Sequence, residues 1–283
     1  MTTYYNNTTR VQFYSGSSID NNVYGVIEGI DSAGIELDKE HDAMKEWDKA
    51  AGAWVDFVRT GKDFTRLELN NPAMFDLIGN VDELFVLDLA CGEGFNTRIL
   101  AGMRAKVFGV DFSEKLINFA EQQEAEEKLG IQYEVADVSD LSGIKNDYFH
   151  LVTCFMAMQD IRDYHQAVAE VGRVLKTEGR FVFSIPHPCF EKITVDEQRI
   201  PAWNNYFEPV EYHINWNMER LEKLFKTTSF HRTLTDYFQS LHLNKLSVQR
   251  LVEPKVNRES LEKYPILQDG LIRPQSVIIE AIK

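Results

Sequence analysis

Two carboxylates and two glycines are spaced in a way that suits the binding of a nucleoside. Asp88 lies near the end of the apolar run LFVLDLA, and Gly92 and Gly94 follow it closely. Asp111 ends the next apolar run, KVFGVD, 23 residues after Asp88. Glycines at such a turn let the backbone approach a ligand, and an acid at the end of the second strand can accept hydrogen bonds from both ribose hydroxyls. The spacing therefore predicts a nucleoside-containing cofactor.

A dinucleotide is disfavoured as that cofactor. Its fingerprint, G-x-G-x-x-G, wants glycine or alanine three positions after the second glycine. Thr97 occupies that position, so the pyrophosphate cradle is incomplete.

The elements that must position these residues alternate between strand and helix patterns from residue 84 onward. Strands are predicted at 84–90, 106–111, 131–137, 149–156 and 180–186, and helices at 96–104, 113–130 and 163–179. Ser113 is the expected N-cap of the second helix, and Gly130 lies at its end. A helix at 232–243 and strands at 245–253 and 276–283 follow. Such alternation predicts an α/β fold with a doubly wound sheet and helices on both faces.

Several segments, in the correct order along the chain, resemble the motifs of the class I S-adenosylmethionine-dependent methyltransferases. DLACGEGF resembles motif I, with Ala90 where many members carry a glycine, and GVDFSEKLI resembles the next motif. VADVSDL resembles the loop that meets the adenine edge, and CFMAMQDI resembles the segment beside the methionine half of the cofactor. GRVLKTEGRFVFSIPHPCF resembles the region of the fifth strand. The resemblance covers roughly residues 42–283.

The resemblance implies a Rossmann-like, seven-stranded sheet whose last strand runs antiparallel, with S-adenosyl-L-methionine as cofactor and S-adenosyl-L-homocysteine as product. Arg66 is either a partner for the cofactor carboxylate or a surface charge. The residues that the resemblance assigns to cofactor binding are Arg66, Asp88, Ala90, Gly92, Gly94, Asp111, Phe112, Asp137, Val138 and Phe155.

Outside the alternating region the sequence suggests an arm, a helix and an insertion. Residues 1–36 are predicted to form an N-terminal arm, which can serve a homodimer contact or close the active site, and residues 37–283 form the methyltransferase domain. An apolar stripe on a predicted helix is interpreted as packing in preference to a ligand cleft. The stripe comprises Met44, Trp47, Ala51, Trp54 and Val58.

Residues 187–231 show no clear strand and are predicted to form a lid or substrate-binding insertion. The insertion is rich in aromatic residues, namely Phe190, Trp203, Tyr206, Phe207, Tyr212, Trp216, Phe225 and Phe230. These aromatic residues suit either an aromatic metabolite or a cationic amine as the substrate.

The sulfonium of the cofactor activates its own methyl group, so the protein must chiefly align the acceptor. A base is needed only where the acceptor must lose a proton. His187 and His231 are candidates for that base, and Tyr206 and Tyr237 for orienting the substrate. Cys189 is interpreted as a buried packing residue in preference to a nucleophile, and no metal site is expected.

The composition of the chain disfavours some classes of binding partner. The net charge of −14 and the lack of a basic run disfavour nucleic acid, and no apolar run is long enough to span a membrane. Three cysteines and no signal-peptide core predict a cytoplasmic protein. The leading hypothesis is a methyltransferase that acts on an oxygen or nitrogen of a small molecule. The alternatives are a non-catalytic cofactor-binding partner subunit and a methyltransferase of RNA or protein.

Overall fold

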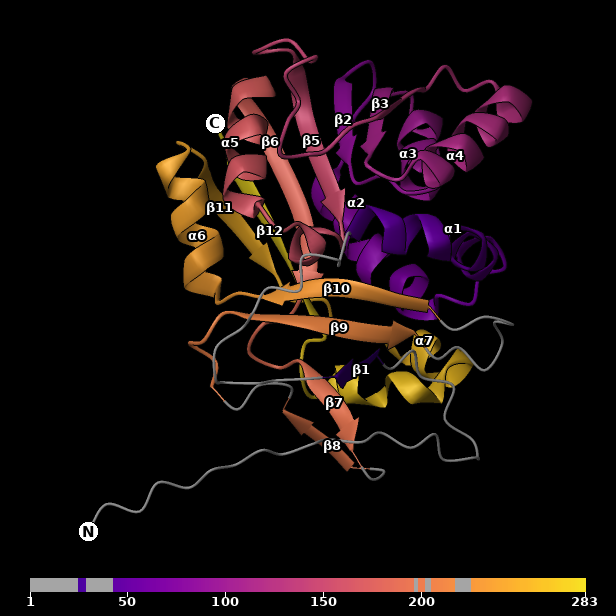
Figure 1. The fold of residues 1–283 in the computed structure, drawn as a ribbon, viewed down its shortest axis with the longest axis vertical. Helices are drawn as coiled ribbons and strands as arrows, with labels where there is room; N and C mark the ends of the chain where they lie inside the picture. Colours follow the sequence, from indigo (N-terminus) through magenta and orange to yellow (C-terminus); the bar gives the residue numbers. More distant parts are fainter. Residues whose placement is uncertain (1–24, 29–42, 196–197, 202–204, 217–224) are drawn as a thin grey trace.

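A seven-stranded sheet organises the chain (Figure 1). In order across the sheet, its strands are β11 (Ser247–Val252), β12 (Ser276–Ile282), β6 (Leu175–Pro186), β5 (Phe149–Phe155), β2 (Phe85–Leu89), β3 (Lys106–Asp111) and β4 (Gln132–Val135). Strands β6, β5, β2, β3 and β4 are parallel, whereas β12 runs antiparallel to both β6 and β11. The predicted doubly wound sheet with an antiparallel last strand is therefore confirmed. This computed structural model describes residues 25–28, 43–195, 198–201, 205–216 and 225–283.

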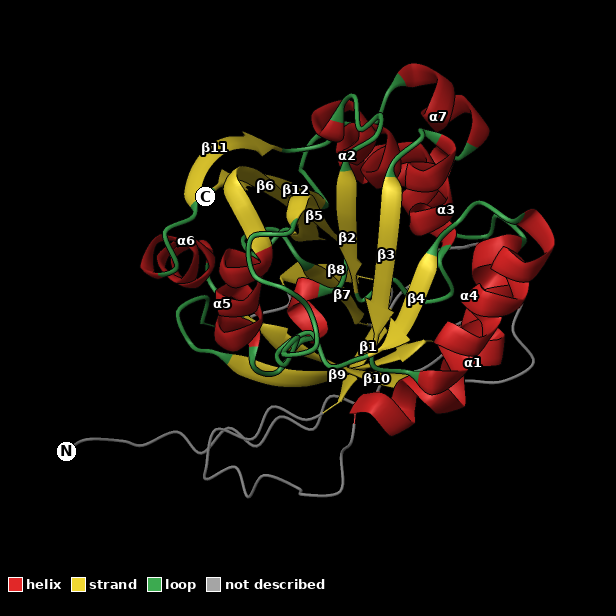
Figure 2. Ribbon diagram, turned by 90° about the horizontal axis from the view of Figure 1, so that it is seen from above, coloured by secondary structure: helices red, strands yellow, loops and turns green. Residues whose placement is uncertain are grey.

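Helices cover both faces of this sheet (Figure 2). The helices α5 (Tyr164–Val174) and α6 (Leu234–Leu243) pack on one face, and α2 (Asn71–Ile78) and α3 (Phe95–Gly102) pack on the other. Successive side chains of a strand point to opposite faces. Accordingly, Leu87 and Leu89 join the core under α5 and α6, and Val86 joins the core under α2 and α3.

Two further helices pack against each other beside the parallel strands. They are α1 (Ala43–Arg59) and α4 (Glu114–Glu127). The side chain of Ser113 accepts the N–H of Leu116 (3.2 Å), which confirms Ser113 as the N-cap of α4. Four short elements complete the described domain: η1 (Arg66–Asn70), η2 (Met158–Asp160), α7 (Arg258–Lys263) and η3 (Pro265–Leu271).

The prediction of an insertion without strands is wrong. Residues 187–231 contain β7 (Lys192–Val195), β8 (Gln198–Pro201), β9 (Val210–Trp216) and β10 (Phe225–His231). The buried part of β10 is mostly polar, since Thr227, Thr228 and Ser229 are buried along with Phe225. Hydrogen bonds to neighbouring elements satisfy these hydroxyls, as in Thr228 to Glu46 (2.9 Å). Polar residues that are buried in this way hide the hydrophobic alternation by which a strand is predicted.

One short segment of the N-terminal arm is described and belongs to a second sheet. Strand β1 (Gly25–Glu28) pairs antiparallel with β9, which also pairs with β10. The two strands β9 and β10 lie across the end of the main sheet at which β5 ends (Figure 1). The rest of the arm, residues 1–24 and 29–36, lies outside the described residues. The division into arm and domain, and the role of the insertion as a lid, stay predictions.

No helix in the described part of the chain has the length and hydropathy needed to cross a membrane.

Candidate functional site

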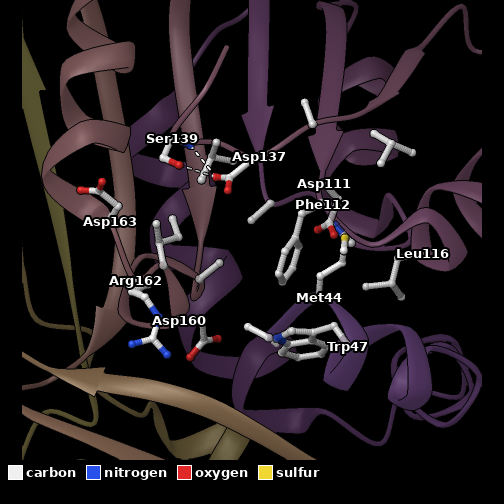
Figure 3. Close-up of a pocket in the computed structure, with 18 of the residues that line it drawn as sticks. Met44, Trp47, Asp111, Phe112, Leu116, Asp137, Ser139, Asp160, Arg162 and Asp163 are labelled. Carbon is white, nitrogen blue, oxygen red and sulfur yellow. Dashed lines mark hydrogen bonds between the residues drawn. The ribbon is translucent and has the colours of Figure 1, made fainter. Parts of the chain in front are cut away.

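A cavity of about 730 Å³ lies outside the carboxyl ends of β2, β3, β4 and β5 (Figure 3). Its walls come from the ends of these strands and the loops that follow them, together with residues of α1 and Leu116 of α4. The chain continues from β2 to β3 and β4 on one side and then returns to β5 on the other side of β2. Ligands of doubly wound folds bind where the strand order reverses in this way.

The glycine turn and the second acid meet at this cavity. Gly92 and Asp111 both line it, and the N–H of Gly92 donates to Oδ2 of Asp111 (2.8 Å). The N–H of Ser113 donates to Oδ1 of the same carboxylate (2.9 Å). Ala90 and Gly92 have left-handed backbones, with φ of 50° and 59°. Glycine adopts that conformation without strain, whereas Ala90 adopts it with a Cβ in place.

Burial raises the pKa of Asp111 to about 6, although the two backbone N–H groups favour its charged form. Above that pH the group is a buried anion at the cavity wall. Its oxygens each hold one N–H and keep further lone pairs, so it can accept hydrogen bonds from a ribose diol.

Gly94 serves packing more than ligand contact. It precedes α3 as its N-cap residue with φ of 81°, and it lies outside the cavity lining. A Cβ at this position would overlap the hydroxyl of Tyr133. The glycine is thus required by the tyrosine ring that packs over the turn.

Asp88 also lies outside the cavity lining. Its Oδ2 accepts the hydroxyl of Thr97 (2.7 Å), and its Oδ1 accepts the hydroxyl of Thr153 (2.8 Å). Burial raises its pKa to about 6. Thr97, the residue that breaks the dinucleotide fingerprint, is therefore a hydrogen-bond partner of Asp88. Their hydrogen bond joins the residues on either side of the glycine turn.

Four other predicted cofactor residues do line the cavity, namely Phe112, Asp137, Val138 and Phe155. Oδ1 of Asp137 accepts both the N–H (2.8 Å) and the hydroxyl (2.7 Å) of Ser139, which fixes the carboxylate at the upper wall in Figure 3. The structure thus brings together the residues expected near the ribose, the adenine and the methionine half.

Arg66 lies outside this lining, and its side chain is 11% exposed. Its guanidinium stacks over the ring of Phe95, 4.5 Å from the centroid, and its Nε lies 3.4 Å from Asp63. Nε and Nη2 are buried and have no hydrogen-bond partner among the described residues. Unsatisfied buried donors of this kind fit an anionic group such as a carboxylate.

His187 does not reach the cavity. Its Nδ1 accepts the N–H of Cys189 (3.2 Å), so its Nε2–H donates to Glu253 (2.9 Å). Both ring nitrogens are engaged in a turn, and the geometry gives no support to a role as base. Cys189 is exposed, contrary to the expectation of a buried residue. It lies within the turn that the His187 ring closes, and its side chain is exposed there.

His231 and Tyr206 likewise stay outside the cavity lining and contact each other. Nε2 of His231 donates to the backbone carbonyl of Tyr206 (2.9 Å), and burial lowers the pKa of this histidine. The hydroxyl of Tyr206 accepts the N–H of Leu234 (2.9 Å). These contacts hold the start of α6 against the insertion. Tyr237 is buried in the core under α6.

The aromatic lining of the cavity comes from α1, Phe112 and Phe155, and not from the described residues of the insertion. Trp47 and Trp54 line the cavity and meet edge to face at 5.3 Å, whereas Ala51 is fully buried. The apolar stripe is thus divided between packing and the cavity. The described aromatic residues of the insertion lie outside the lining: Tyr212 is buried, and Phe207 is 80% exposed. Trp203 and the side chain of Trp216 lie outside the described residues.

Two groups of lining residues were not predicted from the sequence. Met44 and the two tryptophans were interpreted as packing, and Met156 and Asp160 received no role. Asp160 lies in the CFMAMQDI segment, so its position after the fourth predicted strand was the signal that could have identified it.

Comparisons with known proteins agree with this geometry. Residues 87–183 match the methyltransferase domain family. A crystal structure of an S-adenosylmethionine-dependent methyltransferase from Mesorhizobium loti is similar, with a TM-score of 0.63 and 25% identity over 75% of this chain and 96% of that chain.

Two curated relatives are also similar. An uncharacterized protein of Haemophilus influenzae is 25% identical over 76% of this chain and 87% of its own length. A ubiquinone biosynthesis O-methyltransferase of Nitrosomonas europaea is 26% identical over 55% of this chain, and the match spans 66% of that relative, slightly under two thirds.

Proposed function

Because the chain belongs to the class I S-adenosylmethionine-dependent methyltransferases, we propose that it transfers a methyl group to an oxygen or nitrogen of a small-molecule metabolite. S-adenosylmethionine is the cofactor of this family, and its sulfonium supplies the activated methyl group. The proposal depends mainly on the cavity. Its volume of about 730 Å³ lies within the range of small-ligand sites, and residues that the sequence predicts to bind a nucleoside line one side of it.

The described residues divide between the parts of the cofactor. Asp111 would accept the ribose hydroxyls, and Asp137 would meet the adenine edge between Phe112 and Val138. The turn at Gly92 would approach the methionine half, with the unsatisfied guanidinium of Arg66 directed to the carboxylate. Each assignment uses a group whose geometry suits its partner.

A small acceptor is favoured over a macromolecule on charge and on shape. The net charge of −14 opposes a nucleic-acid substrate. Residues of α1 wall the cavity, so an acceptor must fit among Met44, Trp47 and the loop after β5. The names of the ubiquinone O-methyltransferase relatives support oxygen as one of the acceptor atoms.

A radiolabelled methyl-transfer screen tests the proposal. Protein, RNA and small-metabolite fractions are incubated with methyl-labelled cofactor and wild-type protein, and Asp111→Asn serves as the variant with impaired cofactor binding. Label is expected in the small-metabolite fraction only. Label in RNA or protein would contradict the acceptor class. Tight S-adenosylhomocysteine binding without transfer to any fraction would instead indicate a partner subunit.

A further inference from the structure

Asp160 is a cavity residue with a side-chain environment unlike that of the other lining acids. It lies at the end of η2, and in Figure 3 its carboxylate is on a different side of the cavity from Asp111. Asp111, Asp137 and Asp163 each accept a backbone N–H. Asp160 instead accepts the hydroxyl of Ser229 and, at 3.3 Å, the amide of Gln159. Its carboxylate is thus positioned by side chains while it stays open to the cavity.

A buried arginine, Arg232, lies between β10 and α6 and fixes the loop that carries this acid. The guanidinium of Arg232 donates to the backbone carbonyls of Met158 (3.3 Å), Ile161 (2.6 Å) and Arg162 (3.1 Å). It also stacks over the ring of Tyr164, 4.2 Å from the centroid. Three carbonyls on both sides of Asp160 are therefore held by one rigid group. Such support from surrounding residues is what keeps a reactive side chain in place.

The surroundings also set the charge of Asp160. Burial raises its pKa to about 7, although Ser229 and Arg232 favour the charged form. The charged and titratable groups that face it are Arg232, Glu191 after β6, Tyr212 of β9, Tyr237 of α6 and Cys154 of β5. Arg162, on the same loop, is paired with Glu211 (2.8 Å). A carboxylate of this kind can both lose and take up a proton near neutral pH.

We propose that Asp160 accepts the proton that the methyl acceptor loses from its O–H or N–H group. The inference rests on the proposed function and assigns the acceptor to a class, namely a hydroxyl compound or a protonated amine. The oxygen or nitrogen forms its new bond to the methyl carbon as the carbon–sulfur bond breaks, and the electron pair of that bond stays on sulfur. The proton of the acceptor moves to the carboxylate of Asp160 and leaves to solvent after product release.

Three probes of different acidity test the step: catechol, tyramine and thiophenol. The first two carry the proton at neutral pH, whereas thiophenol is largely ionised and needs no base. Asp160→Asn keeps the shape of the side chain, and Asp82→Asn is the matched control, an exposed acid paired with Arg104 far from the cavity. We expect Asp160→Asn to lower transfer to catechol and tyramine by about 100-fold or more. Transfer to thiophenol should change by less than about fivefold, since base catalysis does not contribute to it.

Two readouts other than turnover accompany the kinetics. Calorimetry should give the same affinity for S-adenosylhomocysteine in Asp160→Asn as in the wild type. Carbon NMR of the labelled aspartate carboxyls, assigned with the variant, should show Asp160 titrating at about 7. A midpoint near the ordinary aspartate value of about 4 would overturn the inference.

The kinetic outcomes separate this inference from the function on which it rests. Undiminished transfer to catechol in Asp160→Asn, or an equal loss with thiophenol, contradicts the role of Asp160 alone. Wild-type protein that binds S-adenosylhomocysteine but methylates none of the probes contradicts both the inference and the small-molecule function.

Discussion

Two buried acids of the same motif region should differ sharply in their effect on the cofactor. Asp88 and Asp111 are both buried, and burial raises the pKa of each to about 6. Only Asp111 lines the cavity. We therefore expect Asp111→Asn to weaken S-adenosylhomocysteine binding strongly and Asp88→Asn to leave it nearly unchanged.

The magnitude follows from the hydrogen bonds at stake. A hydrogen bond to a charged group contributes about 1.5–3 kcal/mol, and the ribose diol offers such donors to Asp111. Loss of about 2–3 kcal/mol corresponds to a Kd raised about 30- to 150-fold. Asp88 has both oxygens bound to threonine hydroxyls and no cavity contact, so its substitution should change the Kd by less than threefold, within about 0.6 kcal/mol.

The two variants also differ in how well the asparagine can be accommodated. In Asp88→Asn the new amide can donate to Thr153, whose hydroxyl can turn to the carbonyl of Leu87 at 3.5 Å. In Asp111→Asn the amide cannot accept the N–H groups of both Gly92 and Ser113. The thermal unfolding of both variants is therefore measured as well, to establish that each variant is folded when its affinity is determined.

Isothermal calorimetry at pH 8, where both wild-type carboxylates are ionised, measures the difference. Equal losses of affinity in two folded variants would refute the separation of roles. A folded Asp111→Asn that binds as tightly as the wild type would remove Asp111 from the cofactor site.

Three further expectations concern stability and the predicted base. The pKa of Asp88 in the folded protein is about 6, above the ordinary value of 3.8, so the folded state binds more protons than the unfolded state between these values. Proton binding by Asp88 therefore stabilises the fold at low pH, and this stabilisation is lost as the pH rises through 6. At 1.36 kcal/mol for each pH unit this contribution is at most about 3 kcal/mol. When the free energy of unfolding from urea titrations is plotted against pH, Asp88→Asn should remove up to that amount of the decrease between pH 4 and 7. An unchanged dependence on pH in the variant would argue against this role of Asp88. Gly94→Ala should lower stability by about 2–4 kcal/mol, because it adds left-handed strain and overlap with Tyr133, and Tyr133→Phe in the same chain should restore part of the thermal midpoint. His187→Ala should lower stability yet keep the rate of methyl transfer within about threefold, which is about 0.6 kcal/mol in the barrier. Abolished transfer with intact cofactor binding would return His187 to the site.

The main sheet could be predicted from sequence because its signals are local. The apolar runs and the N-cap Ser113 mark β2, β3 and α4 to within a few residues. The predicted helix at 163–179 is the exception, since α5 ends at Val174 and β6 begins at Leu175. Leu175 pairs with Phe149 in the sheet, and this contact between distant segments outweighs the local preference.

Side chains whose partners lie far away in the sequence could not be predicted. In the sequence Ser229 is typical of a loop, whereas in the structure its buried hydroxyl donates to Asp160, 69 residues earlier in the chain. The histidines were favoured as bases because their type suits proton transfer, yet both ring nitrogens of His187 and Nε2 of His231 are bound elsewhere. Residue type suggests a chemistry, but only the fold decides which groups face the cavity.

Polar contacts also explain how α1 comes to cover the cofactor motif. Arg59 near the end of the helix donates to Glu93 (2.7 Å), a buried residue within the glycine turn. Near its start, Glu46 accepts the hydroxyl of Thr228 on β10 (2.9 Å). Trp47 lines the cavity from between these two points. The wall over the ligand is thus attached at one end to the cofactor loop and at the other to the strand that positions Asp160. The helix therefore contacts both the glycine turn and the strand whose Ser229 bonds to Asp160.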